Sequence, residues 1–192
     1  ANHEYGINAT DAAQVTEATL RARGEVHQIV RGLRKLGGPW DAVQIAATPE
    51  QIGIRDGRRI RGRYLMTSED LIQGATQADA VVRATFPVDI HALTAEDNKK
   101  AAYHNAGVKV KPYDIPLRAL IARDVDGLMM AGRCISGDFI AHASYRVTGN
   151  AVAMGEAAGA TAAVAVKKKT APHDVPWSAV QPVIEQARQR GS

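Results

Sequence analysis

The chain has 192 residues, with 24 basic and 20 acidic side chains and a formal net charge of +4 at neutral pH. Hydrophobic residues make up 45% and charged residues 23%, which excludes an intrinsically disordered protein. The basic clusters lack interleaved aromatic residues and no stretch is apolar for long enough to span a bilayer, so we expect no nucleic-acid partner and no membrane span. The single cysteine, Cys134, excludes an internal disulfide; this leaves the compartment open and favours a cytoplasmic location.

The first third of the sequence predicts a long helix followed by strands. Thr10 can cap the helix, with Asp11 adding negative charge to its first turn, and Gly37-Gly38 ends it. One apolar face is expected from Val26, Ile29, Val30, Leu33 and Leu36, and a solvated face from Arg21, Arg23, Arg31, Arg34 and Lys35. Strand-like "AVQIAAT" follows, and then "QIGIRDGRRIRGRYLM", where Asp56-Gly57 predicts a turn between two strands.

The middle of the sequence predicts short elements. Thr67 or Ser68 can cap a helix in "SEDLIQG", and a second helix is predicted over 79–85. "FPVDIH" is expected to be extended and ends on His91, and the polar segment 92–106 predicts a loop or flap. "VKVKPYDIPL" is again extended, with prolines that keep it out of the middle of a sheet.

The last third begins with "DGLMMAGR", whose apolar run over 128–131 predicts a short buried strand. A polar run follows, and then a helix over 150–166 that closes on the cations of 167–169, at the negative end of its dipole. Gly155, Gly159 and many alanines leave one face of this helix with almost no bulk. We therefore expect that face to pack closely on a sheet or a neighbouring helix.

The polar run between strand and helix carries the candidate chemistry, because ligands of α/β folds bind beyond the carboxyl ends of strands. Asp138 can accept hydrogen bonds from ligand hydroxyls or serve as a plain turn aspartate. Arg146 can bind an anion, and His142 can be an acid or base, a substrate contact or a buried structural histidine. The free N–H groups at the start of the following helix would stabilise an anion. The histidines show no metal-ligand spacing, so no metal site is expected.

The segment "LMMAGRCISGDFIAHASYRVTGNAVAMGEAAGATAA" resembles the carboxyl-terminal part of FAD-dependent oxidoreductases in the glutathione-reductase-like superfamily. More narrowly, it resembles the family related to fumarate reductase and succinate dehydrogenase flavoproteins. "IGIRDGRRIRGRYLMTSEDL", "FPVDIH" and "YDIPLRAL" resemble upstream blocks of that family in the same order. The resemblance covers about Gln51 to Val166.

The resemblance implies an α/β fold, α+β overall, that joins two parts. One is the C-terminal strand–helix part of an FAD-binding Rossmann-like domain, and the other is a mixed-sheet substrate-binding domain. Residues 1–117 would form the inserted substrate-binding domain, 118–170 the C-terminal part of the FAD-binding domain, and 171–192 a tail helix.

The resemblance also implies FAD as cofactor and assigns the site residues. Cofactor contacts are expected from Gly132, Arg133, Asp138, Gly149, Asn150, Ala151 and Val152. Catalytic roles are implied for His142 and Arg146, which would lie near the flavin ring or the substrate. Substrate contacts are expected from His91 and Tyr113, with a structural role as the alternative for His91.

The sequence departs from the family in having no GxGxxG and no phosphate-loop glycine pattern. We therefore expect an amino-terminal FAD-binding half, in the same polypeptide or on a partner chain, and weak FAD binding without it. The expected reaction is hydride transfer between a small organic substrate and flavin N5. The alternative is a non-catalytic binding or assembly subunit of a flavoprotein complex, and assembly into an oligomer is left open.

Overall fold

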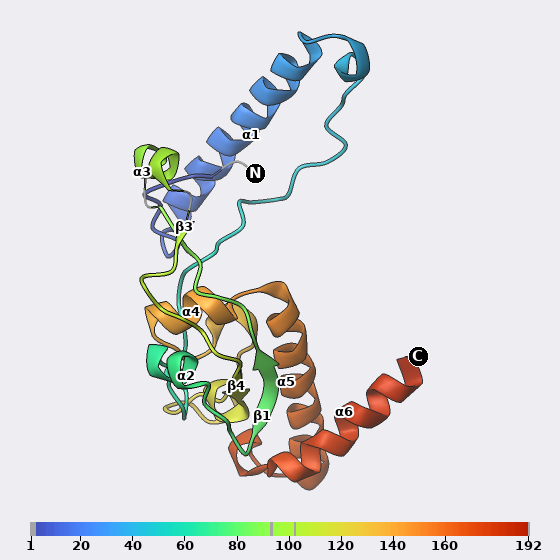
Figure 1. Ribbon diagram of the computed structural model, residues 1–192. Helices are drawn as coiled ribbons and strands as arrows, with labels where there is room; N and C mark the ends of the chain where they lie inside the picture. Colours follow the sequence, from blue (N-terminus) through green and yellow to red (C-terminus); the bar gives the residue numbers. More distant parts are fainter. Residues whose placement is uncertain (1–2, 93, 102, 192) are drawn as a thin grey trace. The chain divides into compact units, whose positions relative to one another are not determined.

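The structure is a computed structural model that describes residues 3–92, 94–101 and 103–191 (Figure 1). Contacts divide the described chain into two compact units. Unit 1 comprises residues 3–57 and 94–100, and unit 2 comprises residues 58–92, 101 and 103–191. No helix among the described residues is long and apolar enough to cross a membrane. All the predicted site residues lie in unit 2.

Unit 1 contains α1 (Ala12–Arg34), the 3-10 turn η1 (Gly38–Trp40) and α3 (Ala95–Lys100). The N-cap of α1 is Asp11 rather than the predicted Thr10. Its carboxylate accepts hydrogen bonds from the backbone N–H groups of Ala13 and Gln14, at 2.9 and 3.2 Å. The bonds from Gln14 are the main reason that the pKa of Asp11 lies below its usual value.

The surface of α1 differs from the predicted division into an apolar and a solvated face. Leu36, just beyond the helix, is 72% exposed and Ile29 is also exposed, so the expected apolar face is not a buried one within the described residues. Arg23 is half-buried, and its guanidinium donates to the backbone carbonyls of Pro49 and Glu50. The strands predicted in "AVQIAAT" and around Asp56-Gly57 are wrong, because the described backbone there forms no ladder.

Unit 2 combines helices with short strands, which confirms the α/β class in its mixed, α+β form. Its strands are β1 (Ala80–Ala84), β2 (Ile90–His91), β3 (Tyr103–His104) and β4 (Tyr113–Pro116). Its helices are α2 (Ser68–Gln73), α4 (Phe139–Tyr145), α5 (Thr148–Lys168) and α6 (Trp177–Gly191). Its 3-10 turns are η2 (Leu117–Ala119), η3 (Gly132–Cys134) and η4 (Pro172–Asp174).

The two sheets of unit 2 are small and antiparallel. β1 pairs with β4, with Val82 opposite Ile115, and β2 pairs with β3 over two residues. The helix predicted over 79–85 is wrong, because β1 occupies that segment and obtains its hydrogen-bond partners from β4. The loop predicted over 92–106 contains α3 and β3, and its residues 93 and 102 lie outside the described residues.

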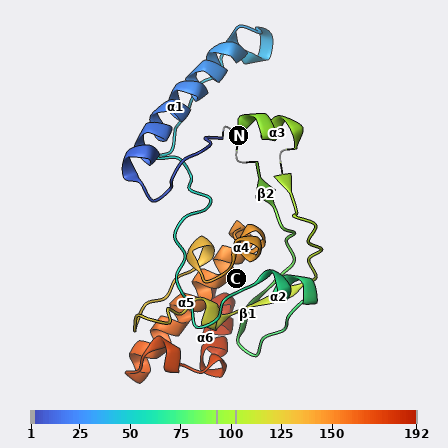
Figure 2. The same ribbon diagram turned by 90° about the vertical axis from the view of Figure 1, so that its left-hand side faces the viewer.

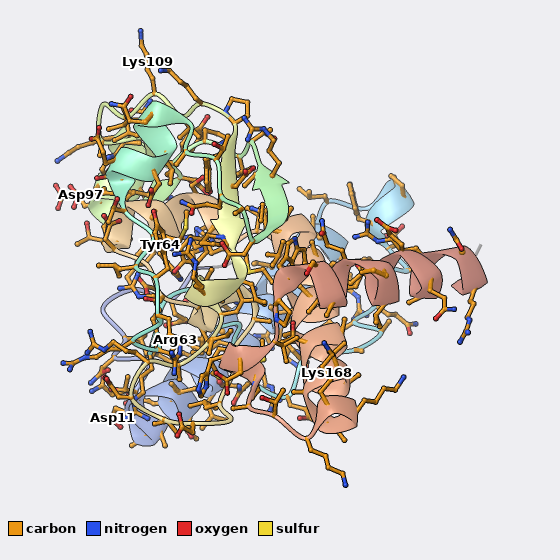
Figure 3. The ribbon with its side chains drawn as sticks, turned by 90° about the horizontal axis from the view of Figure 1, so that it is seen from below. Asp11, Arg63, Tyr64, Asp97, Lys109 and Lys168 are labelled. Carbon is orange, nitrogen blue, oxygen red and sulfur yellow. The ribbon has the colours of Figure 1, made fainter. Side chains whose placement is uncertain are left out.

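One hydrophobic core joins residues from both sides of the domain boundary predicted at residue 117. Its largest fully buried members are Met66, Leu71, Tyr113, Ile115, Leu120, Ile135, Tyr145 and Met154. The extended segment before β4 covers this core by alternation: Val108 and Val110 pack against it, while Lys109 extends outward (Figure 3). The predicted boundaries at 117 and 170 stay predictions.

Helices α2 and α5 of unit 2 lie where the sequence predicts them. Thr67 caps α2 in a capping box with Asp70, as predicted. The predicted helix over 150–166 is confirmed as α5, which begins slightly earlier and ends in a left-handed Lys169. α5 packs against β1 and α6 (Figures 1 and 2), and Arg188 of α6 donates to the carboxylate of Glu156 at 2.6 Å.

The buried strand predicted over 128–131 is wrong for the described chain. The segment makes only an isolated bridge between Ile121 and Met129, and Leu128 is 39% exposed. A short apolar run needs neighbouring strands to become part of a sheet. Beyond the bridge to Ile121, the described residues of unit 2 provide no strand that pairs with this segment.

The small-residue face of α5 is also uncovered, contrary to the predicted close packing. A Cβ added at Gly155 or Gly159 would meet nothing within 4 Å. Val152 and Val166, at the two ends of the same face, are 68% and 78% exposed. The face of α5 that enters the core of unit 2 instead carries Met154, Ala157, Thr161, Val164 and Ala165.

Candidate functional site

The turn before the polar run is built around Gly132. Its φ of +70° is a left-handed value that favours glycine, and an added Cβ would lie 3.4 Å from the Cβ of Ala151. The Gly132 N–H donates to the sulfur of Met154 at 3.3 Å. The structure thus brings together the predicted cofactor residues Gly132 and Ala151, at the junction of η3 with the first turns of α5.

The amino end of α5 is open. Val147 is its N-cap, and no side chain of the described residues accepts from the first N–H groups there. Thr148 and Gly149 are exposed, and a Cβ at Gly149 would meet nothing within 4 Å. A helix of 21 residues with a free amino end carries partial positive charge there, so it can stabilise an anion or an electron-rich carbonyl. Asn150 faces inward and donates to the carbonyl of Tyr145.

Asp138 is the N-cap of α4. Its Oδ1 accepts from the N–H of Ala141 at 2.7 Å, and its Oδ2 accepts from the N–H of Ser68 at 2.9 Å. Its backbone carbonyl accepts from the guanidinium of Arg59. The carboxylate therefore joins α4 to α2 within unit 2. This is the structural role that the sequence analysis gave as the alternative to ligand binding, and a contact with a cofactor stays a prediction.

His142 and Arg146 lie on the last turn of α4, four residues apart as predicted. The His142 side chain is fully buried and meets the ring of Tyr145 edge-on, with ring centroids 5.4 Å apart. Arg146, the C-cap, is half-buried and donates from Nη2 to the backbone carbonyl of Asp89. Arg146 is therefore the better placed of the two for contact with a ligand, and both catalytic roles stay predictions.

His91 lies at the same end of α4, because Asp89 links it to Arg146. The Nε2 of His91 is 3.0 Å from the Oδ2 of Asp89, and the Asp89 N–H donates to the carbonyl of Ala143 in α4. His91, a predicted substrate contact, and Arg146, a predicted catalytic residue, thus both contact Asp89. The sequence analysis did not identify Asp89 as a candidate site residue.

Tyr113 lies in the core rather than on an accessible wall. Its hydroxyl is 2.8 Å from the Oγ of Ser144, which donates to the carbonyl of Phe86. Burial raises the pKa of Tyr113 to about 12, because the phenolate would be desolvated. The hydroxyl connects β4, α4 and the segment before β2, and a contact with substrate stays a prediction.

The remaining predicted cofactor residues, Arg133 and Val152, are exposed. Apart from Asp138 at the start of α4, the residues predicted for FAD therefore lie at η3 and the start of α5, while His91 and Arg146 both contact Asp89 near the end of α4. No group of three or more potential metal ligands occurs among the described residues.

A comparison with protein-family models matches residues 1–184 to the FAD dependent oxidoreductase model. The chain belongs to the FAD dependent oxidoreductase family. The cofactor of this family is FAD, as the sequence predicts. Neither the curated proteins nor the solved structures contain a significant match.

The described residues of this FAD dependent oxidoreductase fit a flavin at the start of α5. The flavin ring becomes electron-rich when reduced, and the amino end of α5 offers N–H groups with open space at Gly149. The left-handed Gly132 removes the side chain that would otherwise stand beside Ala151. The sequence signal for this arrangement was the polar run followed by a helix of small residues.

Proposed function

We propose that this chain supplies the flavin-facing and substrate-facing part of an oxidoreductase of the fumarate reductase and succinate dehydrogenase flavoprotein type, within the glutathione-reductase-like superfamily. When bound, FAD supplies the redox chemistry by exchanging a hydride with a substrate carbon at N5. The residues of this chain hold the ring and orient a small organic substrate. The observation that carries the proposal is the open amino end of α5 beside left-handed Gly132, in a member of an FAD dependent family.

The role of α5 is electrostatic. Its first N–H groups would face the pyrimidine end of the flavin, where negative charge gathers on reduction. Arg146 adds a cation at the end of α4, held in place by the carbonyl of Asp89. Together they favour the reduced flavin and an anionic or polar substrate.

The adenosine part of FAD would be held by an amino-terminal nucleotide-binding half. This sequence contains no GxGxxG, and the small-residue face of α5 is open at Gly155 and Gly159. Such a face lets another backbone approach closely, and the exposed Leu128 lies in a run with the composition of a sheet strand. These two surfaces support a partner half that covers them, in the same polypeptide or on a second chain.

The experiment compares two substitutions at one exposed position, Gly149→Asp and Gly149→Asn, in the chain assembled with its nucleotide-binding half. An aspartate in the first turn stabilises the helix itself, so a loss of FAD cannot be attributed to unfolding of α5. We expect Gly149→Asp to weaken FAD binding several-fold and to lower the flavin reduction potential, and Gly149→Asn to do neither. Equal behaviour of the two variants would refute the role of α5.

The flavin absorption spectrum separates the enzyme from its alternative. Flavin in the assembled protein supports the proposal, and its absence there would favour a non-catalytic assembly subunit. Flavin retained by the isolated chain would refute the need for the other half. An Arg146→Ala variant that keeps flavin and full turnover would remove Arg146 from the site.

A further inference from the structure

The first half of α1 packs within unit 1. Ala18 is fully buried and Thr19 is 7% exposed. The Oγ1 of Thr19 accepts from the backbone N–H of Ile52 at 3.1 Å, so the segment around Ile52 lies against this half of the helix. One side of α1 is therefore a packing side, and the chain itself covers the beginning of it.

The second half of α1 leaves apolar side chains in water. Ile29 lies about three helical turns after Ala18, and Leu36 lies about two turns after Ile29, because Lys35 keeps helical dihedral angles beyond the end of α1. The two side chains are 54% and 72% exposed, and Trp40 in η1 is 45% exposed. Ile29, Leu36 and Trp40 are called the apolar ridge.

The charges beside the apolar ridge have one sign. The charged side chains of residues 26–40 are Arg31, Arg34 and Lys35, so three cations and no carboxylate give this segment a net charge of +3. Arg34 donates to an uncharged group, the carbonyl of Val43. The negative end of the helix dipole accounts for cations at this place, but it does not account for the exposed apolar side chains next to them.

An anionic bilayer fits this combination better than a second copy of the chain. Two copies that paired through the apolar ridge would bring together three cations from each, with no carboxylate between them. Helices of low net hydrophobicity that carry Lys and Arg on one side and Leu or Trp on the other lie flat at bilayer surfaces. Tryptophan is enriched at the headgroup level, and long cationic side chains extend to the headgroups while their stems stay on apolar surface.

We propose that α1 and η1 form a peripheral binding surface for anionic bilayers. The apolar ridge enters the boundary between headgroups and acyl chains, and Arg31, Arg34 and Lys35 interact with the headgroup phosphates. Each cation near such a surface strengthens binding roughly fivefold, so the attachment is reversible and depends on salt. The proposal concerns unit 1 and does not depend on the proposed redox function.

The first test is co-sedimentation of the full chain with vesicles of phosphatidylcholine, alone or with about one-third phosphatidylglycerol. We expect binding to the mixed vesicles to be at least about tenfold stronger than to phosphatidylcholine alone. It should be lost in about 1 M NaCl, where exposed charges are screened over about 3 Å. Equal binding to both vesicles, or no binding to either, would overturn the proposal.

Leu36→Asp tests whether the apolar ridge is the contact. A carboxylate there should abolish binding to the mixed vesicles, and exposure of Leu36 makes unfolding an unlikely cause of the loss. Leu65→Asp is the matched control, because Leu65 is 56% exposed and lies two residues from the exposed Arg63 in unit 2. It should bind like the wild type. Equal binding by the two variants would exclude the apolar ridge.

Trp40 reports directly on insertion. The chain has two tryptophans, so in a Trp177→Phe background the fluorescence comes from Trp40. We expect its emission to move to shorter wavelength with mixed vesicles and to be quenched by brominated lipid, because the ring leaves water for the acyl boundary. A chain that sediments with vesicles while Trp40 stays unquenched binds through another surface, which would contradict the proposal.

Two results would assign the apolar ridge to a protein instead. A dimer of the full chain that Leu36→Asp dissociates would assign it to a second copy. Loss of vesicle binding when the chain is assembled with its nucleotide-binding half would assign it to that half. Either result overturns the proposal, and neither changes the flavin spectrum that tests the proposed function.

Discussion

The turn between η3 and α4 should tolerate no side chain at Gly137. A Cβ there would lie 2.5 Å from Cε1 and 2.7 Å from the hydroxyl oxygen of Tyr145, whose ring is fully buried. The ring cannot swing into solvent, and its hydroxyl donates to the carbonyl of Ile135 at 3.1 Å. Gly137→Ala must therefore displace the ring or the backbone.

The expected cost has two parts. Forcing an extra methyl group into a packed core costs about 1–3 kcal/mol, and loss of the Tyr145 hydrogen bond adds about 0.5–1.5 kcal/mol. We expect a loss of about 2–4 kcal/mol in the free energy of unfolding of unit 2. With a urea dependence of about 1–3 kcal/mol per molar, the unfolding midpoint should fall by roughly 1 M or more.

Urea unfolding followed by fluorescence measures this loss. The chain has two tryptophans, and in a Trp40→Phe background the signal comes from Trp177, which packs against the core of unit 2. Gly149→Ala is the control, because its Cβ would meet open space, and its midpoint should equal or slightly exceed that of the parent. A Gly137→Ala midpoint within error of the parent would refute the packing argument.

Three further predictions concern the same unit. Gly132→Ala should destabilise it by about 1–2 kcal/mol in the same assay, because an L-residue is strained at a φ of +70°. Asp138→Ala should cost about 1–2 kcal/mol through loss of the α4 cap, and Asp138→Asn should lose less, because its amide oxygen can still accept from Ala141 although its NH2 cannot accept from Ser68; equal losses would show that capping is not the cause. The pKa of Tyr113 is raised to about 12 in the folded chain, so its stabilisation is complete below pH 10 and is lost as pH rises from 10 to 12; Tyr113→Phe should lack that part of the pH dependence of the unfolding midpoint.

The sequence predicted the elements whose signals are local. The capping box of Thr67 and Asp70 needs only four consecutive residues, and the small residues of α5 lie on one continuous helix. Predictions failed where distant residues decide. β1 reads as a helix by itself, and it is a strand because Tyr113–Pro116 offers it a partner. The run over 128–131 has the residues of a buried strand but no neighbouring strand among the described residues.

The sequence identified candidate site residues, but it did not predict most of the contacts between them. Gly132 and Ala151 do meet, and Asp89 joins His91 to Arg146. A sequence signal for Asp89 existed in "VDIH", where two apolar residues alternate with two polar ones. What the sequence could not provide is the contact with α4, which lies more than fifty residues later.

The open face of α5 makes the effect of a substitution depend on assembly. In the isolated chain, alanine at Gly155 or Gly159 meets no atom and improves helix propensity, so it should stabilise α5 by about 0.5–1 kcal/mol. Once another backbone lies against that face, the same methyl group would hold the two surfaces apart. Such a substitution would therefore raise the stability of the isolated chain and lower the affinity of its assembly with the other half. Opposite effects on these two quantities would show that the small-residue face of α5 is an assembly surface, and no ligand needs to be known for that measurement.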